Sequence, residues 1–93
     1  MADLDRIKRD IKQIAQRQRG TRFREIKRVV DQLSEIGFTV SSRSANETHL
    51  FRVNDQLWGV CTHNRGSQHV KSVYVRAFLL AMANLDLYDE GEQ

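Results

Sequence analysis

Apolar residues recur at three- and four-residue steps along two stretches of the first 36 residues, which predicts two amphipathic helices. The first covers residues 3–17, and Gly20 follows as a natural stop. The second begins at Thr21, whose hydroxyl can cap it, and runs to Ile36. Gly37 supplies the left-handed residue after that helix, so Phe38 is expected to fold back onto it in a Schellman ending.

A third helix is predicted from Val73 to about Leu85, with Ser72 as its cap. Its apolar arc is wide, which indicates a well-buried helix. One side carries Val73, Ala77, Leu80, Ala81 and Asn84, and the adjoining side carries Phe78, Met82 and Leu85.

Between the second and third helices the pattern changes to alternation, which predicts three short strands. They cover residues 38–43, 47–53 and 56–61, with turns at 44–46 and at Asn54-Asp55. Both faces of this alternation are mixed, so it does not say which face meets the helices. Residues 62–71 form a polar loop. The order α-α-β-β-β-α predicts a two-layer α+β domain, with helices on one face of a three-stranded antiparallel sheet.

Composition narrows the class of protein. The 93 residues fit a single domain, and the chain has no apolar run near the roughly 18 residues that a membrane span needs. The charged start from Asp3 onward has no apolar core of a secretory signal. Cys61 is the only cysteine, which excludes an intramolecular disulfide and multi-cysteine zinc sites and fits a reducing cytoplasm.

The net charge of +3 hides a gradient along the chain. Residues 1–30 hold ten Lys/Arg against four Asp/Glu, residues 31–82 hold five against four, and the last eleven hold none against four. The basic end is either a phosphate-binding surface or a solvated helix face, and the sequence leaves both open. The acidic end either screens the basic end or aids solubility.

His49 is the first candidate for chemistry, because it lies on a strand between Arg43 and Arg52. Histidine exchanges protons near neutral pH, and fixed guanidinium charges favour a polyanion beside it. The alternative is an ordinary surface or half-buried strand histidine.

Other polar residues offer weaker signals. Cys61 and His63 could be half of a metal site with His69, but the chain lacks a second cysteine, so we expect no metal. Cys61 is either a nucleophile or, more commonly for such a position, a small packing residue. The stretch from Arg65 to Ser67, with Lys71, could cradle a phosphate ahead of the last helix, although it is not a P-loop. No paired carboxylates of the glycosidase kind stand out.

The order of these elements resembles the HicA toxins, small bacterial mRNA interferases with a fold like the double-stranded-RNA-binding domain (dsRBD). The resemblance covers roughly residues 4–88. Its carriers are Phe23-Arg24-Glu25-Ile26, Glu35-Ile36-Gly37-Phe38, Arg43 through Thr48-His49, and Gly66 to Arg76 with Lys71-Ser72-Val73-Tyr74-Val75-Arg76. It implies an N-terminal helical extension at residues 1–19, a core at 20–88 and an acidic tail at 89–93.

The family's Gly-Ser-His motif corresponds here to Glu47-Thr48-His49, followed by Leu50 in place of an optional second histidine. The resemblance implies that His49 is catalytic, as general base on the RNA 2′-hydroxyl or general acid on the leaving oxygen, without metal or cofactor. The implied RNA-binding residues are Arg43, Thr48, Arg52, Arg65 and Lys71.

The resemblance also implies the partners: single-stranded mRNA as substrate and a HicB antitoxin protein that covers the active site, in the cytoplasm. Two other functions stay open. Glu47 in place of the motif's glycine favours a non-catalytic RNA-binding module, and the basic face could instead serve a protein-interaction domain. The oligomeric state is open too, since the apolar stripe of the first helix could mediate a dimer if it does not pack on its own domain.

Overall fold

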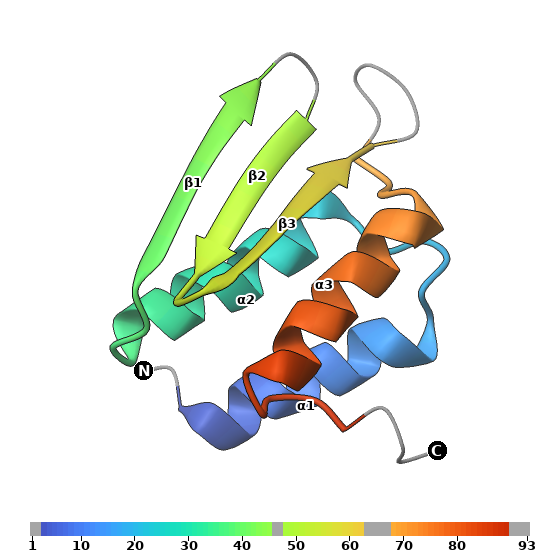
Figure 1. Cartoon of the computed structure of the whole chain (residues 1–93). Helices are drawn as coiled ribbons and strands as arrows, with labels where there is room; N and C mark the ends of the chain where they lie inside the picture. Colours follow the sequence, from blue (N-terminus) through green and yellow to red (C-terminus); the bar gives the residue numbers. More distant parts are fainter. Residues whose placement is uncertain (1–2, 46–47, 63–67, 90–93) are drawn as a thin grey trace.

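The computed structural model describes residues 3–45, 48–62 and 68–89. It confirms the α+β class and the order α-α-β-β-β-α (Figure 1). The elements are α1 (Leu4–Gln16), α2 (Phe23–Glu35), β1 (Val40–Ala45), β2 (Thr48–Val53), β3 (Gln56–Cys61) and α3 (Ser72–Asn84).

The helix starts differ slightly from the predicted ones. Asp3 caps α1 by accepting a hydrogen bond from the Arg6 amide at 2.8 Å. Thr21 does not cap α2: it is fully buried, and its carbonyl accepts from the Val70 amide at 2.9 Å. Arg22 is the N-cap instead, and its amide donates to the Glu25 carboxylate at 2.7 Å. Helix α3 already includes Ser72, which was predicted to cap it.

The end of α2 has the predicted Schellman geometry. Gly37 has a φ of 106°, the Gly37 amide donates to the Ser34 carbonyl, and the Phe38 amide donates to the Leu33 carbonyl at 3.0 Å. This turn reverses the chain from α2 into β1. Only glycine adopts such a φ without a steric penalty.

The three strands form one antiparallel sheet in the order β1-β2-β3. The turn at Asn54-Asp55 is the predicted two-residue hairpin, with Asn54 at a positive φ of 54°. Ser44 and Ala45 were predicted to turn, which is wrong, because both continue β1 and pair with His49 and Thr48. The first strand therefore starts and ends two residues later than predicted.

One face of the sheet is covered by helices. Phe51 and Val53 on β2 and Trp58 and Val60 on β3 are buried there, and we call this the inner face. Phe51 contacts Phe23 of α2 with ring centroids 5.9 Å apart, and Trp58 contacts Phe78 of α3 at 5.8 Å. Helix α2 lies behind the sheet and α3 runs along β3 (Figure 1). The alternate positions form the outer face.

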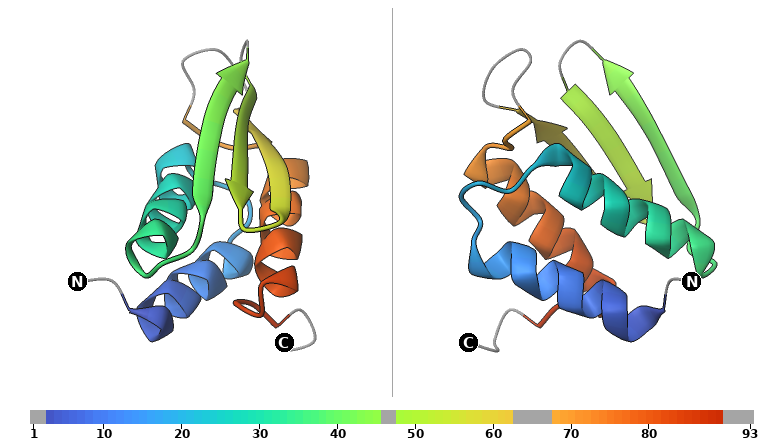
Figure 2. Two further views of the ribbon diagram at one scale, coloured as in Figure 1. Left: turned by 60° about the vertical axis from the view of Figure 1, so that its left-hand side comes forward. Right: turned by 180° about the vertical axis from the view of Figure 1, so that it is seen from behind.

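Helix α1 lies across α2 and α3, at the end of the molecule away from the start of β2 (Figure 2). Its three isoleucines, Ile7, Ile11 and Ile14, are buried in the common hydrophobic core. The apolar stripe of the first helix therefore packs on its own domain, and the condition for a dimer through that stripe is not met.

Helix α3 is less covered than its apolar arc predicted. Phe78 and Met82 are fully buried, whereas Val73 and Leu80 are 62% and 52% exposed. The predicted well-buried side with Val73 and Leu80 is therefore wrong, and the buried side centres on Phe78. None of the helices in the described part of the chain is long and apolar enough to cross a membrane.

Candidate functional site

His49 lies on the inner face of β2, near the start of that strand, and is half-buried. Its Nδ1 is 2.8 Å from the hydroxyl oxygen of Ser44, its cross-strand neighbour on β1. Its ring lies against Phe23 in the first turn of α2, with centroids 4.5 Å apart and planes tilted by 38°. These two contacts fix both the position and the orientation of the imidazole.

The second ring nitrogen, Nε2, has no hydrogen-bond partner among the residues that the structure describes. The role of Nδ1 toward Ser44 depends on the tautomer. If Nδ1 carries the proton and donates to the hydroxyl, Nε2 is a free base. If the hydroxyl donates to Nδ1, Nε2 carries the proton and can act as an acid.

Several chain segments meet beside His49. The Phe23 amide donates to the Gln68 carbonyl at 2.8 Å, and Arg22 forms an antiparallel bridge with His69. The Lys71 amide donates to the Cys61 carbonyl at 3.2 Å, which joins this segment to the end of β3. The starts of α2 and α3 are thereby held close together (Figure 1).

This end of the molecule favours anions. The side chains of Arg22, His69 and Lys71 are all exposed there. Helix N-termini add partial positive charge from their unpaired amides. We call the group of Arg22, Phe23, Ser44, His49, His69 and Lys71 the His49 end.

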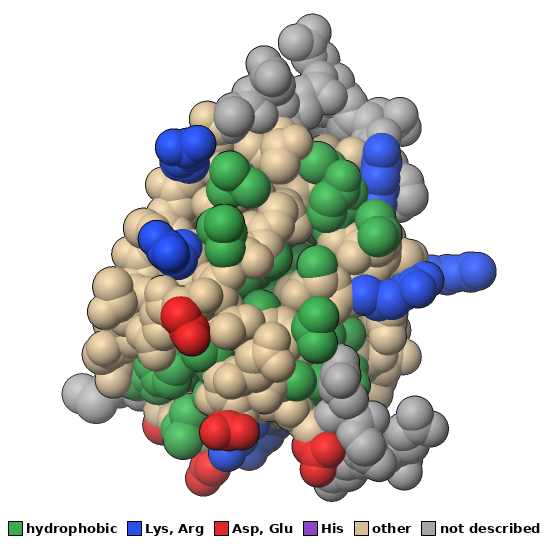
Figure 3. Space-filling model, in the orientation of Figure 1, with side chains coloured by type: hydrophobic (Ala, Val, Ile, Leu, Met, Phe, Trp, Pro, Cys, Tyr) green, Lys and Arg blue, Asp and Glu red, His purple; other side chains and the backbone are tan. Residues whose placement is uncertain are grey.

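Arg43 and Arg52, which flank His49 in the sequence, do not share its face. Arg43 pairs with Leu50 and Arg52 pairs with Leu57, and all four belong to the outer face. Successive side chains of a strand point to opposite faces, so residues an odd number of positions from His49 lie across the sheet from it. Figure 3 views the outer face: Lys and Arg side chains stand at its margins, and no described histidine is visible on it.

Thr48 also lies on the outer face, and its hydroxyl is 3.1 Å from the sulfur of Cys61. The Cys61 side chain in turn hydrogen-bonds Tyr74 of α3. That hydrogen bond, the charge interaction with Cys61 and burial together raise the pKa of the Tyr74 phenol above its ordinary value. Thr48 is thus part of a polar chain across the edge of β3 and not of the His49 end.

The other predicted site residues have different outcomes. Lys71 is exposed and is the N-cap of α3, within the His49 end. Arg65 lies outside the described residues, as do Glu47, His63, Gly66 and Ser67. Within residues 3–45, 48–62 and 68–89, no three His, Cys, Asp or Glu side chains come together as metal ligands would.

Sequence reasoning missed Ser44 and Phe23 as contacts of His49. Ser44 was assigned to a turn and Phe23 to the apolar stripe of a helix. The antiparallel register of β1 and β2 sets Ser44 opposite His49, and ending the predicted first strand at Arg43 hid that pairing. Phe23 has no sequence signal, because contact between a helix start and a distant strand depends on tertiary packing.

Comparison with known proteins adds no evidence to these geometric observations. No family model, no curated protein and no solved structure matches the chain.

Proposed function

We propose that this chain is a metal-independent endoribonuclease that cleaves mRNA at His49, and that it acts as the HicA-like toxin of a type II toxin–antitoxin pair in the cytoplasm. The observation that carries the proposal is the fixed imidazole. Ser44 and Phe23 orient the ring of His49, and Nε2 has no partner among the described residues. A held histidine with one available nitrogen is what general acid–base catalysis needs.

In the proposed reaction Nε2 of His49 takes the proton of an RNA 2′-hydroxyl while Nδ1 donates to Ser44. The 2′-oxygen attacks the adjacent phosphorus and the bond to the 5′-oxygen breaks, while the leaving 5′-oxygen takes a proton from water, so the products are a 2′,3′-cyclic phosphate and a 5′-hydroxyl. In the other tautomer His49 gives its Nε2 proton to the leaving 5′-oxygen, and water takes the proton of the 2′-hydroxyl. DNA lacks the attacking hydroxyl and is not a substrate.

Positive charge at the His49 end would stabilise the phosphate in the transition state. Lys71 and Arg22 are the exposed cations on the segments that adjoin Phe23. Arg43, Arg52 and Thr48 are on the outer face, so in this proposal they contact RNA away from the cleaved bond. Arg65 remains an RNA-binding candidate on the strength of the sequence alone.

The direct test is cleavage of a 5′-labelled mRNA fragment in the presence of EDTA. The wild-type chain should cleave it, and His49→Ala should reduce the rate by about 100-fold or more, the usual range for loss of a general acid–base group. RNA binding by His49→Ala should stay unchanged. His69→Ala, which removes the other described histidine of the His49 end, should lower the rate less than His49→Ala does. Equal cleavage by wild type and His49→Ala would overturn the proposal.

The toxin role has its own test. Induced expression in a bacterium should arrest growth for the wild-type chain and not for His49→Ala at equal protein level. Co-expression of a HicB-like antitoxin should relieve the arrest. Arrest by both proteins would mean that toxicity does not depend on this histidine.

A second candidate function is RNA binding without cleavage. It is favoured by the separation of His49, half-buried against Phe23, from Arg43 and Arg52 on the opposite face. Salt-sensitive RNA binding with no cleavage by the wild type would establish this function.

A protein-interaction domain is the third candidate, and the observation in its favour is the exposure of large apolar side chains. Leu57 of β3 is 63% exposed, and Val73 and Leu80 of α3 are similarly uncovered. Within the main proposal these residues are candidate contacts for the antitoxin. A stable complex with another protein, together with no measurable affinity for RNA, would favour this third function.

A further inference from the structure

We propose that the groove between α1 and α2 is a docking site for the phosphate backbone of single-stranded nucleic acid, bound without regard to base sequence. The groove faces away from the sheet, where α1 and α2 lie in front when the molecule is seen from behind (Figure 2, right). It is separate from the His49 end. The identification of RNA as the natural occupant rests on the proposed function. The arrangement of charges at the groove is observed independently of that function.

The groove is a surface hollow between two helices that run side by side. Its lining, polar or charged except for Ile14, comes from both helices: Asp10, Gln13 and Ile14 of α1 with its C-cap Arg17, and Glu25 and Arg28 of α2. Gln32 donates a hydrogen bond to Asp10 at 3.2 Å, and Arg17 forms an ion pair with Glu25. These contacts join the two walls and set their spacing.

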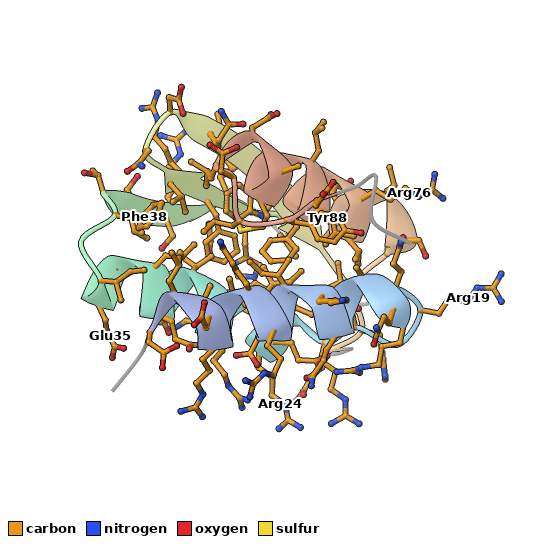
Figure 4. All side chains as sticks on the ribbon, turned by 90° about the horizontal axis from the view of Figure 1, so that it is seen from below. Arg19, Arg24, Glu35, Phe38, Arg76 and Tyr88 are labelled. Carbon is orange, nitrogen blue, oxygen red and sulfur yellow. The ribbon has the colours of Figure 1, made fainter. Side chains whose placement is uncertain are left out.

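Arginines lie in the groove and beside it: Arg17 and Arg28 line the hollow, and Arg9 and Arg24 lie one or two helical turns away on the same helices. On α1, Arg9, Gln13 and Arg17 follow one another at four-residue steps and therefore lie along one side of the helix. On α2, Arg24 and Arg28 are one turn apart, and Arg28 lines the hollow. Figure 4 shows Arg24 projecting from this side of the molecule, among other nitrogen-tipped side chains.

The carboxylates in the groove are already engaged. Glu25 accepts hydrogen bonds from Arg17 and from the Arg22 amide, and Asp10 accepts from Gln32. Arg9, Arg24 and Arg28 have no carboxylate partner among the described residues, and all three are exposed. Within the lining Arg17 balances Glu25 and Arg28 balances Asp10, so the net positive charge of this surface comes from Arg9 and Arg24 beside the hollow. A string of phosphates spaced along it would meet guanidinium groups on both sides, and guanidinium binds phosphate in a fork geometry.

A nucleic-acid backbone fits this surface better than a membrane or an acidic protein. Membrane-bound helices and most protein interfaces need large apolar side chains beside the charges. Ile14 is the only apolar side chain in the lining, and it is buried. The most exposed apolar side chains of the described chain, Leu57, Val73 and Leu80, are on β3 and α3.

The test is fluorescence anisotropy with a labelled single-stranded DNA of mixed sequence, about 20 nucleotides long, which covers the usual site sizes. DNA is chosen because a backbone contact needs no 2′-hydroxyl, whereas cleavage does, so the wild-type chain can be used intact. Arg24→Gln/Arg28→Gln should raise Kd about 10-fold near 0.1 M salt. The slope of log Kd against log salt should fall by about 1.5, because each phosphate contact contributes about 0.7.

Lys8→Gln/Lys12→Gln is the matched control, since it removes the same charge, also at i,i+4 spacing, from the side of α1 away from the groove. Lys8 and Lys12 are each two residues from Asp10, which places both about half a turn from the groove. This variant should bind DNA within about twofold of wild type. All four side chains are exposed, and circular dichroism should report unchanged folding.

Equal losses of DNA affinity in the two double variants would mean a general charge effect and would overturn the proposal that the groove binds DNA. Absence of DNA binding by the wild type would overturn it as well. If Arg24→Gln/Arg28→Gln left DNA binding intact but abolished binding to vesicles containing phosphatidylserine, the occupant would be a membrane and the proposal would be wrong. DNA lacks the 2′-hydroxyl that cleavage needs, so this result is independent of whether the chain cleaves RNA.

Discussion

Ser44 and His49 face each other across β1 and β2, so the orientation of the imidazole depends on one hydroxyl. Ser44→Ala removes that hydrogen bond and leaves the contact with Phe23. In the proposed endoribonuclease we expect cleavage to fall about 10-fold, a part of the usual contribution of acid–base catalysis, because the ring is no longer held in one orientation. Single-turnover cleavage at saturating protein would measure the change, and RNA affinity should not move.

Ser41→Ala is the control for this prediction. Ser41 is on the same strand but pairs with Arg52, three residues away from Ser44 and on the outer face. Its replacement should leave cleavage unchanged. A similar loss in both variants would show that β1 as a whole tolerates no change, and not that Ser44 orients His49.

Cys61 and Tyr74 give a prediction for pH dependence. The contact with Cys61 raises the pKa of the Tyr74 phenol, so Cys61→Ala should move its titration down toward the ordinary value. Ultraviolet difference titration would show this, with Tyr74→Phe used to subtract the signal of Tyr88. The folded phenol holds its proton more tightly than the unfolded one. Its stabilising effect is therefore intact below about pH 10 and is lost as pH rises through the folded pKa. An unchanged titration in Cys61→Ala would refute the coupling.

At this scale the sequence made His49 a candidate, and it assigned this residue the wrong neighbours. Arg43 and Arg52 are near it along the chain, and the alternation of a strand carries both to the other face. Ser44 appeared to belong to a turn because serine is common in turns. Which residues lie opposite each other depends on register, and the sequence pattern ended the first strand at Arg43, one residue before the pair of Ser44 and His49.

Among the elements, the end of α2 was the most predictable feature, because a glycine followed by a large apolar residue indicates a Schellman ending. The start of α2 was harder to predict. Thr21 is a good capping residue, but its backbone carbonyl is bonded to the Val70 amide, and the helix begins after Arg22. A residue 49 positions away along the chain decides this boundary, and no local pattern reveals it.

Gly37→Ala tests the importance of the left-handed turn after α2. A Cβ at this position meets nothing within 4 Å, so the cost comes from the backbone alone. We expect about 1–2 kcal/mol of lost stability, the penalty of left-handed backbone for a residue with a Cβ. Urea denaturation would measure it.

Gly59→Ala is the matched control for that substitution. Its new Cβ would lie 3.6 Å from Leu50 and Thr48, at ordinary contact distance, and its φ is not in the left-handed region. Stability should stay within about 0.5 kcal/mol, or rise slightly because alanine is better than glycine inside a strand. Equal losses for Gly37→Ala and Gly59→Ala would contradict the backbone explanation.

For the whole molecule, the class and the order of elements followed from the periodicity, but the position of the first helix did not. Its apolar stripe predicts that Ile7, Ile11 and Ile14 are buried, and it does not say against what. The residues that cover them belong to α2 and α3, so the domain core includes a helix that the sequence resemblance treats as an extension.

Ile11→Ala tests this integration. Ile11 is fully buried, and its truncation should cost about 2–5 kcal/mol, the usual range for a large core residue. Leu4→Ala, on the same helix but 42% exposed, should cost less than about 1 kcal/mol. Thermal or urea unfolding would compare the two. Similar small losses would mean that α1 is only loosely attached to the rest of the domain.

The packing of α1 on α3 has a consequence for how the protein is made. Translation produces α1 well before α3, with α2 and the whole sheet between them. During that interval the three isoleucines of α1 lack part of their cover, because one of the two helices that bury them does not yet exist. The hydrophobic core of this domain therefore closes only when α3 has left the ribosome. Until then nascent chains stay incompletely folded and open to chaperones and proteases.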